Sequence, residues 1–444
     1  MIYFAAGCGD LWFDEVLSLQ WAKSARSPWD LLLTFKHDNN HPLNTAWLAM
    51  VGVGQSPWLL RSLSMAAGVG SVWLLYRIAR RLIPAVALAA VLVFAFSYSS
   101  VLYFSEARGY APAVLCCLVL FELIENGGDR WFVVLLFWLV AVLGLLSHAT
   151  VVYPLVALGV FQAARSLHAR LAAGKVFARL AVWFAIPAAA AGILYLTFWK
   201  PMMIAGGPGS SSWEIAADFF AYTFGFPLGG GWGLPIVLLS ATWLFAGWFL
   251  GPWPPGARSF FTVLVLAPMA VLWVTRPEYV AFRYFLVVTP FLVILAFGCF
   301  AGLAEHGPVW RWLAWLVVAL SLATQAPRVA ALIVHGRGTS TAALDYIVQN
   351  GGGDIFSDHD MLVGMVVEDL RGRNPGYQPL HYHPQWASAA IPPRWLILHT
   401  QKGRPQPPEE TVSAVGAIYR FEETFPSAPV SGATWQVYRR VDTP

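Results

Sequence analysis

Residues 131–164 read WFVVLLFWLVAVLGLLSHATVVYPLVALGVFQAA and contain no Asp, Glu, Lys or Arg. Because a helix crosses a membrane with about 20 mostly apolar residues, this stretch is long enough for two spans. Ser147-His148 marks a weak break between them, and a re-entrant arrangement is an alternative there. The whole chain of 444 residues has the same character, since 58% of it is hydrophobic and only 12% is charged. Soluble domains are about one-quarter charged, so we expect a polytopic membrane protein.

Ten segments qualify as spans by this reasoning. They are Trp58–Leu82, Ala85–Phe104, Gly109–Asn126, Trp131–His148, Ala149–Arg165, Phe177–Trp199, Trp232–Leu250, Ser259–Thr275, Arg283–Leu303 and Val309–Val334. Pro42–Val53 is too short to span, and we expect an interfacial or half-buried helix there. The expected fold class is an all-α polytopic membrane domain of about ten spans, followed by a small C-terminal α/β soluble domain.

The boundary between these two domains follows from the charge density. Residues 335–444 hold 20 of the chain's 52 charged residues, which is far more than their share of the length. We therefore assign residues 1–334 to the membrane domain, with a first outer loop at 1–57, and residues 335–444 to the soluble domain. Within the latter the patterns predict helices at 344–349 and 360–370 and strands at 354–357, 395–399, 418–423 and 434–439, the last two as a hairpin.

Short loops rich in Lys and Arg predict the orientation of the spans. Arg80 and Arg81 close the first span, and the loop at 165–179 carries a second basic cluster on the same side. Because basic loops stay in the cytoplasm, that side is expected to be cytoplasmic. The N-terminus and the C-terminal domain then lie outside, and we expect one further span upstream of Met1. Most acidic residues of the membrane domain fall on the outer side.

Several classes of function are excluded or disfavoured by composition. A net charge of +4 without a long basic run is against nucleic-acid binding. The four cysteines have neither metal-ligand nor disulfide-framework spacing. The histidines and acids at 358–360 and 381–383 match no standard zinc pattern, so no metal site is predicted. A transporter or flippase for lipid-linked sugars or small molecules stays an alternative, although no inverted repeat is apparent and the polar residues lie near one surface. A third reading is a structural subunit with a degenerate enzyme fold.

Two candidate sites lie in the first outer loop. In DLWFDEVLSLQWAK, residues 10–23, Asp14 and Glu15 are adjacent. Neighbouring helical residues point about 100° apart, so the two carboxylates cannot do the same job. The alternative is an ordinary helix start, where acids favour the helix dipole. Further along, His41-Pro42 opens the short helix, and His41 is either a ligand-facing residue or a loop histidine beside a turn.

Later segments add charged residues to apolar surroundings. Glu106 and Arg108 lie in YFSEARGYA, residues 103–111, where ionisable groups are costly and usually functional; the alternative is a structural ion pair. Arg283 follows Arg276 and Glu278 in residues 275–290, at the outer mouth of a span. Guanidinium groups on the outer side favour an anionic partner such as a phosphate, and the alternative is anchoring to lipid headgroups. Arg61 and His148 are further polar groups near this surface, and a lone His148 also fits a satisfied core histidine.

Taken in order, these segments resemble the GT-C superfamily of polyprenol-dependent glycosyltransferases. The branch that is most similar holds protein O-mannosyltransferases and the lipid A aminoarabinose transferase. The resemblance rests on five motifs over roughly residues 10–300: Trp12-Phe13-Asp14-Glu15, His41-Pro42-Leu43-Asn44, Arg61 through Arg80-Arg81-Leu82, Ser105-Glu106-Ala107-Arg108-Gly109-Tyr110, and Arg283-Tyr284 with Pro290. Leu43 replaces the second Pro of the family's His-Pro-Pro pattern, and no Pro follows Arg61.

The resemblance implies an inverting membrane glycosyltransferase, a hexosyl- or pentosyltransferase, in the cell envelope. It would move a sugar from a polyprenyl phosphate to a hydroxyl of a protein, lipid or glycan, at the extracytoplasmic face of a bacterial inner or plasma membrane. Asp14 would be the base, and Glu15 would position it or shape the acceptor site. Arg283, Arg108 and His41 would bind the donor phosphate. No cofactor is required, and a divalent cation stays open. The supporting residues would be Glu106, which fixes Arg108, together with Arg61, Tyr284 and His148.

Overall fold

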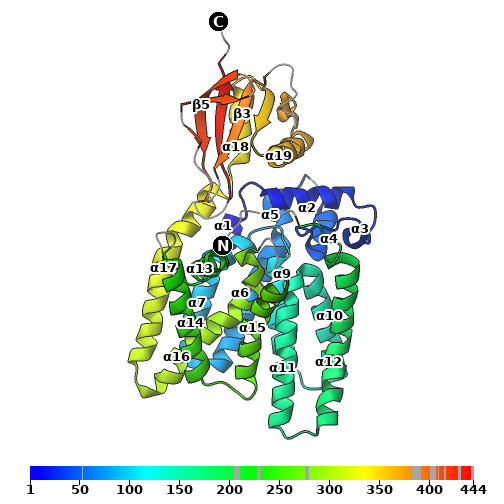
Figure 1. Cartoon of the computed structure of the whole chain (residues 1–444), viewed down its shortest axis with the longest axis vertical. Helices are drawn as coiled ribbons and strands as arrows, with labels where there is room; N and C mark the ends of the chain where they lie inside the picture. Colours follow the sequence, from blue (N-terminus) through cyan, green and yellow to red (C-terminus); the bar gives the residue numbers. More distant parts are fainter. Residues whose placement is uncertain are drawn as a thin grey trace. The chain divides into compact units, whose positions relative to one another are not determined.

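The computed structural model of the chain describes residues 1–52, 54–204, 211–227, 232–275, 280–382, 392–400, 407–408, 410–414, 417–428 and 432–441. These residues form two compact units (Figure 1). The larger unit is residues 25–47 and 62–326. The smaller unit is residues 1–24, 48–61 and 327–444, so the N-terminal segment belongs with the C-terminal domain.

The larger unit is helical. Its elements are α3 (Asp30–Leu33), most of α4 (Pro42–Val51), α6 (Ser62–Leu82), η1 (Pro84–Val86), α7 (Ala87–Phe96), α8 (Tyr98–Phe104), α9 (Tyr110–Asn126), α10 (Trp131–Ser147), η2 (Ala149–Val151), α11 (Val152–His168), α12 (Ala173–Leu194), η3 (Tyr195–Trp199), α13 (Ser212–Phe224), α14 (Gly233–Leu250), α15 (Ala257–Thr275), η4 (Phe282–Val288), α16 (Thr289–Leu303), η5 (Ala304–His306) and the first two-thirds of α17 (Val309–His335).

All ten segments predicted as spans are helical in the structure. Among the described residues, six helical stretches are long and apolar enough to cross a membrane, and a bent pair raises the number to seven. That pair is Pro84–Phe96 with Tyr98–Phe104, which meet at 57°. The bend follows from Ser97, which is extended and whose side chain caps α8 by accepting a hydrogen bond from Ser100 N. These helices make the protein an integral membrane protein.

Side-by-side packing of neighbouring helices forms the core of this unit. Helix α6 packs on α9, α10 packs on α9 and α12, α11 packs on α15, and α14 packs on α16 (Figure 1). Helix α16 is apolar on all sides and nearly every residue of it is buried, as expected for a central helix. At one end, Arg81 of α6 donates hydrogen bonds to Glu122 and Glu125 of α9, so two segments predicted to share the inner side do lie together.

Two further predictions on helix ends are confirmed. The chain does break at Ser147-His148, because α10 ends at Ser147 and His148 is extended (φ −163°, ψ 137°) before η2 begins. The short segment at Pro42 is a helix of 10 residues with proline at its start, too short to span. Helix α13, by contrast, was not predicted; it starts with a capping box of Ser211 and Glu214 and ends at Gly225, which has φ 87°.

The smaller unit holds the soluble domain. Its elements are α1 (Ile2–Ala6), α2 (Phe13–Ser24), α5 (Pro57–Leu60), the end of α17, α18 (Ser340–Gln349), β1 (Gly353–Ser357), α19 (Asp360–Arg373), η6 (Pro375–Tyr377), β2 (Leu380–Tyr382), β3 (Trp395–Thr400), β4 (Thr411–Ala414), β5 (Ala417–Phe425) and β6 (Thr434–Arg440). The predicted α/β class is therefore confirmed.

The six strands form one mixed sheet in the order β2-β1-β3-β6-β5-β4. Strands β1, β2 and β3 run parallel, whereas β6 is antiparallel to both β3 and β5. The predicted hairpin of β5 and β6 is confirmed, and the edge strands β2 and β4 were not predicted. Phe356, Leu396, Tyr419 and Tyr438 form the core on one face, and α18 packs on β5 and β6 while α19 packs on β1 and β2.

Candidate functional site

Two histidines that are distant in sequence stack on each other in the larger unit. His41 lies just before α4 and His148 lies between α10 and η2, and their ring centroids are 5.1 Å apart with planes 25° apart. Tyr110, at the start of α9, packs against both rings, at 5.2 Å from His41 and 4.8 Å from His148. Tyr284 of η4 lies 6.0 Å from His148. Three of the five sequence motifs, and the predicted break at His148, thus contribute to this unit's polar centre.

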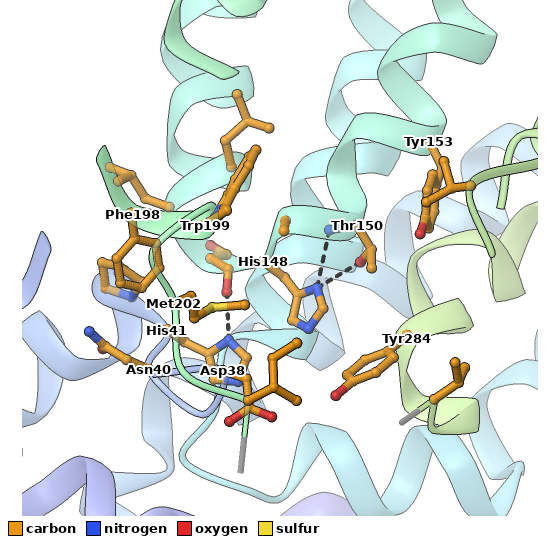
Figure 2. A pocket seen from close by; sticks show the side chains of 18 residues that line it. Asp38, Asn40, His41, His148, Thr150, Tyr153, Phe198, Trp199, Met202 and Tyr284 are labelled. Carbon is orange, nitrogen blue, oxygen red and sulfur yellow. Dashed lines mark hydrogen bonds between the residues drawn. The ribbon is translucent and has the colours of Figure 1, made fainter. Parts of the chain in front are cut away.

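The hydrogen bonds of the two rings define which nitrogen carries the proton. His41 Nδ1–H donates to Ser147 O at 3.1 Å, so its Nε2 is the acceptor that faces Arg108 Nη2 at 3.4 Å. His148 Nδ1 accepts from Thr150 N at 3.2 Å, so its proton sits on Nε2. His148 Nε2–H is therefore a hydrogen-bond donor, and Figure 2 shows this edge of the ring directed away from Thr150 toward Tyr284.

Both histidines are held neutral. Burial and the positive charge of Arg108 lower the pKa of His41 well below its ordinary value of 6.5. Burial, followed by the charges of Arg108 and Arg283, lowers the pKa of His148 to about 3. Two arginines thus act on two neutral imidazoles from close range. An anion that entered here would meet positive charge and hydrogen-bond donors. The Nδ1 atoms of the two imidazoles are bonded to Ser147 O and Thr150 N rather than to a carboxylate.

Arg108 is fixed by contacts on several sides. It is 1% exposed, its Nη2 donates to Asn39 Oδ1 at 2.5 Å, and its Cζ lies 5.0 Å from the ring centroid of Tyr110. Arg283 is half-buried on η4, and its Cζ lies 5.7 Å from the ring of Tyr284. The predicted phosphate ligands His41, Arg108 and Arg283 are therefore brought together with Tyr284 and His148.

The loop 105–109, which carries Arg108, is held in place by its backbone. Asn44 Nδ2 donates to Ala107 O at 2.6 Å, and Ser64 Oγ donates to Arg108 O at 2.9 Å. Gly109 lets this loop reach the end of α10, since a Cβ at that position would lie 2.0 Å from Ser147 O and 2.9 Å from the Cβ of His41. Only glycine fits this approach.

A cavity of about 220 Å³ opens beside the histidine pair (Figure 2). Polar groups line part of it and an apolar wall lines the rest, as is usual for small-molecule sites. The polar residues are Asp38, Asn40, His41, Ser147, His148, Thr150, Tyr153 and Tyr284. The apolar wall includes Leu145, Leu146, Phe198, Trp199, Met202, Ile204, Val271 and Val280. Arg108 and Arg283 are not among the lining residues, and their charges act on the two histidines of the lining.

Several residues of this centre were not predicted. Asp38 lies in the cavity lining, with its carboxylate 2.9 Å from His37 Nδ1 and its backbone N donating to Met203 O. Asn39 holds Arg108, Thr150 lies in η2 after His148, and Tyr153 lies at the start of α11. The dense polar run HDNNH at 37–41 was the available signal, and sequence reasoning used only its last residue.

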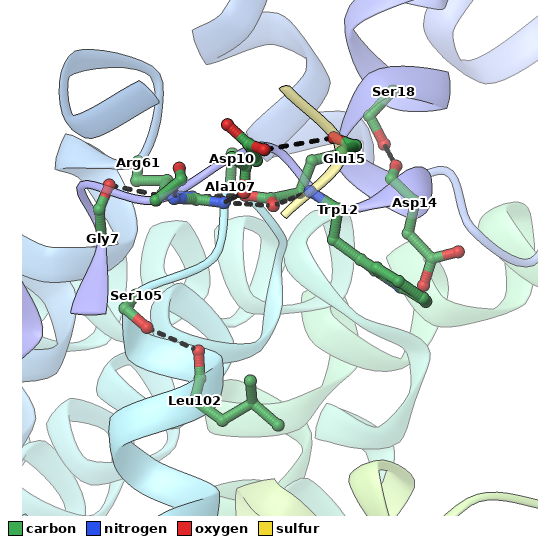
Figure 3. Close-up of polar contacts among 12 residues, drawn as sticks. Gly7, Asp10, Trp12, Asp14, Glu15, Ser18, Arg61, Leu102, Ser105 and Ala107 are labelled. Atoms are coloured by element: carbon green, nitrogen blue, oxygen red, sulfur yellow. Dashed lines mark hydrogen bonds and ion pairs between the residues drawn. The ribbon is translucent and has the colours of Figure 1, made fainter. Parts of the chain in front are cut away.

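The predicted acidic pair lies in the smaller unit, where the two carboxylates have different surroundings. Glu15 is 1% exposed and accepts from Arg61 Nε at 2.8 Å and from Arg61 Nη2 at 2.7 Å (Figure 3). It also accepts from Trp12 N at 2.7 Å, which is one half of a capping box at the start of α2. Both oxygens of Glu15 are therefore engaged in holding the loop, and its predicted catalytic role stays a prediction.

Arg61 completes this arrangement. Besides Glu15, its guanidinium donates to the backbone oxygens of Gly7, Gly9 and Asp10 at 2.7–2.9 Å, and the side chain is 4% exposed. Arg61 is therefore a structural residue that shapes the loop before α2. Asp14, in the first turn of α2, is half-buried and its carboxylate points away from this pair in Figure 3.

The remaining predictions are placed as follows. Glu106 is buried at 2% exposure, and its predicted role of fixing Arg108 stays a prediction. Arg276 and Glu278 lie outside the described residues, as does His383. Among the residues that are described, no cluster of His, Cys, Asp and Glu could hold a metal ion.

Comparison with known proteins shows the fold. No protein-family model matches the chain, and no curated protein matches it. The crystal structure of ArnT from Cupriavidus metallidurans in the apo state is similar, with a TM-score of 0.52 and 13% identity, over 89% of this chain and 90% of that chain. The structure of the same protein bound to undecaprenyl phosphate gives a TM-score of 0.49 and 12% identity, over 89% and 91%. The resemblance drawn from the five motifs is thus confirmed at the level of the fold.

Proposed function

We propose that this integral membrane protein, which has the fold of ArnT, is an inverting glycosyltransferase. It would take a sugar from a polyprenyl-phosphate donor and transfer it to a hydroxyl group of a protein, lipid or glycan acceptor. The observation that carries the proposal is the centre formed by His41, His148, Arg108 and Arg283 beside a cavity in the membrane domain.

The chemistry of that centre suits the phosphate of the donor. As the bond between the anomeric carbon and the phosphate oxygen breaks, negative charge accumulates on the leaving polyprenyl phosphate. Arg108 and Arg283 would stabilise this charge, and His148 Nε2–H and the hydroxyl of Tyr284 would donate hydrogen bonds to it. Because these groups are fixed before the substrate arrives, little reorganisation accompanies the reaction. The apolar wall with Phe198 and Trp199 would accommodate the less polar parts of the donor.

Asp14 is the proposed general base. It would accept the proton of the acceptor hydroxyl while the hydroxyl oxygen attacks the anomeric carbon, in one displacement that inverts the configuration. Two observations support Asp14 over its neighbour: Arg61 occupies both oxygens of Glu15, and the carboxylate of Asp14 points away from that pair. The resemblance in sequence also assigns the base to this position.

The scheme requires no metal ion, since two guanidinium groups supply the positive charge, and a divalent cation is left to experiment. We further propose that the reaction takes place on the extracytoplasmic side of a bacterial inner or plasma membrane. The acidic and arginine-bearing segments that build the site fall on that side in the span assignment from the sequence.

The test uses purified protein in detergent and a panel of radiolabelled polyprenyl-phosphate sugars. Wild type is compared with Asp14→Asn and with Asp30→Asn, a control that removes the charge of another loop carboxylate that accepts two backbone N–H groups. We expect wild type and Asp30→Asn to release polyprenyl phosphate and Asp14→Asn to release at least about a hundredfold less. Equal activity of Asp14→Asn would refute its role as the base. Failure of wild type to bind or turn over any donor would refute the enzyme and favour transport.

A further inference from the structure

Helix α18 of the C-terminal domain is capped by a residue from the N-terminal segment. Its own N-cap residue, Thr339, makes no side-chain cap. Asp10 supplies the cap instead: its Oδ2 accepts from Thr341 N at 2.7 Å and from Ser340 Oγ at 3.2 Å, and its Oδ1 accepts from Thr341 Oγ1 at 2.7 Å. A carboxylate at this position satisfies one N–H group of the first turn and interacts favourably with the helix dipole.

Two aromatic residues between Asp10 and Asp14 in the sequence, Trp12 and Phe13, contact the C-terminal domain. The guanidinium carbon of Arg337 lies 4.3 Å from the ring centroid of Trp12, a cation–π distance. The ring of Phe13 lies 5.9 Å from that of His359, at the start of α19, and α2 packs along α19. The side chains of Asp10, Trp12 and Phe13 thus all contact the C-terminal domain, and Leu11 is buried.

The opposite side of the same segment is held by Arg61. We call residues 7–15 the acidic loop. Arg61 donates to the carbonyl oxygen of Asp10, while the carboxylate of Asp10 is bound to α18. Glu15, at the end of the loop, is bound to Arg61 as well. The backbone on the N-terminal side of Asp14 is therefore clamped between one arginine and one helix terminus.

From this geometry we propose that the C-terminal domain positions the proposed base, with Asp10, Thr341 and Arg337 as the positioning residues. This inference rests on the proposed function of Asp14. The domain would not touch the reacting atoms; it would fix the first turn of α2, so that the carboxylate of Asp14 has one orientation when the acceptor arrives. The contact is specific, because Asp10 binds both the backbone and the hydroxyl of a single residue, Thr341.

The first arm of the test measures the contact without any turnover. Hydrogen exchange of amides 8–16 is followed in full-length Asp10→Asn and Thr341→Val proteins. Thr341→Ser is the conservative variant, because it keeps both donors, and Asp30→Asn is the control at a carboxylate that accepts backbone N–H groups elsewhere in the chain. We expect exchange about tenfold faster in Asp10→Asn and Thr341→Val, and wild-type exchange in Thr341→Ser and Asp30→Asn.

The second arm measures turnover of the polyprenyl-phosphate donor by the same proteins. We expect kcat to fall about tenfold in Asp10→Asn and Thr341→Val, with an unchanged KM for the donor, because the residues of the donor cavity are untouched. The double variant Asp10→Asn/Thr341→Val should lose no more than Asp10→Asn alone, since the hydroxyl of Thr341 donates to the carboxylate that Asp10→Asn already removes. Thr341→Ser should keep the wild-type kcat.

The outcomes separate this inference from the function on which it rests. Faster exchange with unchanged kcat would overturn the positioning role, and unchanged exchange in Asp10→Asn would overturn the contact itself. If kcat and the folded fraction fall in proportion in Asp10→Asn and Thr341→Val, and Thr341→Ser does not restore them, the contact only stabilises the fold and does not position Asp14. If wild type turns over no donor, the proposed function fails first, and the exchange arm still reports whether the domain holds the acidic loop.

Discussion

Replacement of Arg61 by methionine tests the internal support of the acidic loop. The change leaves the carboxylate of Glu15, which is 1% exposed, without its ion pair, and it removes three hydrogen bonds to the carbonyl oxygens of Gly7, Gly9 and Asp10. Loss of one partner from a buried ion pair costs about 3–5 kcal/mol, because the remaining charge is buried and uncompensated. We therefore expect the loop to open locally while the membrane helices stay folded.

The magnitude can be read from amide hydrogen exchange. If 3–5 kcal/mol is lost from the local opening free energy, exchange accelerates by about two to almost four orders of magnitude, at about 1.4 kcal/mol per factor of ten. The reporting amides are Trp12 N, which donates to Glu15, and Val16 N, which donates to Trp12 O. Mass spectrometry of peptides that cover residues 8–16 gives the measurement.

Two matched variants make this prediction sharp. Arg77→Met is the same substitution at an exposed ion pair with Glu122, 3.2 Å long and with the arginine 50% exposed, and it should leave exchange of the loop unchanged. The double variant Arg61→Met/Glu15→Gln removes both charges but keeps a side-chain acceptor for Trp12 N, and it should exchange more slowly than Arg61→Met alone. Acceleration of less than about threefold in Arg61→Met would refute the reasoning.

Three further predictions concern the histidine centre. Gly109→Ala should abolish donor binding, because its Cβ would lie 2.0 Å from Ser147 O, whereas Gly192→Ala, with nothing within 4 Å, should bind the donor normally in a filter assay. The pKa of His148 is lowered from 6.5 to about 3, so only the unfolded chain takes up this proton as the pH falls below 6.5. Between pH 7 and pH 5 the free energy of unfolding of wild type should therefore fall by about 2 kcal/mol more than that of His148→Gln, as measured by thermal unfolding of both proteins. If both proteins lose the same stability over this range, the imidazole of His148 is not held neutral. Asp38→Asn should raise the KM for the donor about tenfold, as one charged hydrogen-bonding group of the cavity is lost, and an unchanged KM would remove Asp38 from the donor site.

The membrane helices could be predicted because length and apolarity alone decide whether a segment spans. All ten predicted segments are helices, and the break at His148 was visible as a polar interruption of an apolar run. Helix α13 could not be found in this way, since its 13 residues are too short for a span and its capping box was overlooked. The edge strands β2 and β4 have only 3 and 4 residues, which is too few to show a periodicity.

The site residues could be predicted as types, but their contacts could not. Arg108 could be predicted as a candidate because a charged residue in an apolar region is costly to bury, and in the structure it is buried beside His41. Nothing in the sequence shows that His41 and His148 stack, because 106 residues separate His41 from its hydrogen-bond partner Ser147. The different fates of Asp14 and Glu15 depend on Arg61, which lies 46 residues beyond Glu15.

In the proposed reaction the histidine centre binds a lipid-linked phosphate, and Asp14 acts only in the chemical step. Binding of a polyprenyl phosphate and single-turnover release from its sugar-loaded form, measured on wild type, Arg108→Met and Asp14→Asn, test both halves together. Asp14→Asn is expected to bind like wild type and to release nothing. Arg108→Met is expected to bind at least about thirtyfold more weakly, since the positive charge beside His41 and His148 is lost. Wild-type binding by Arg108→Met, or release by Asp14→Asn, would contradict the account.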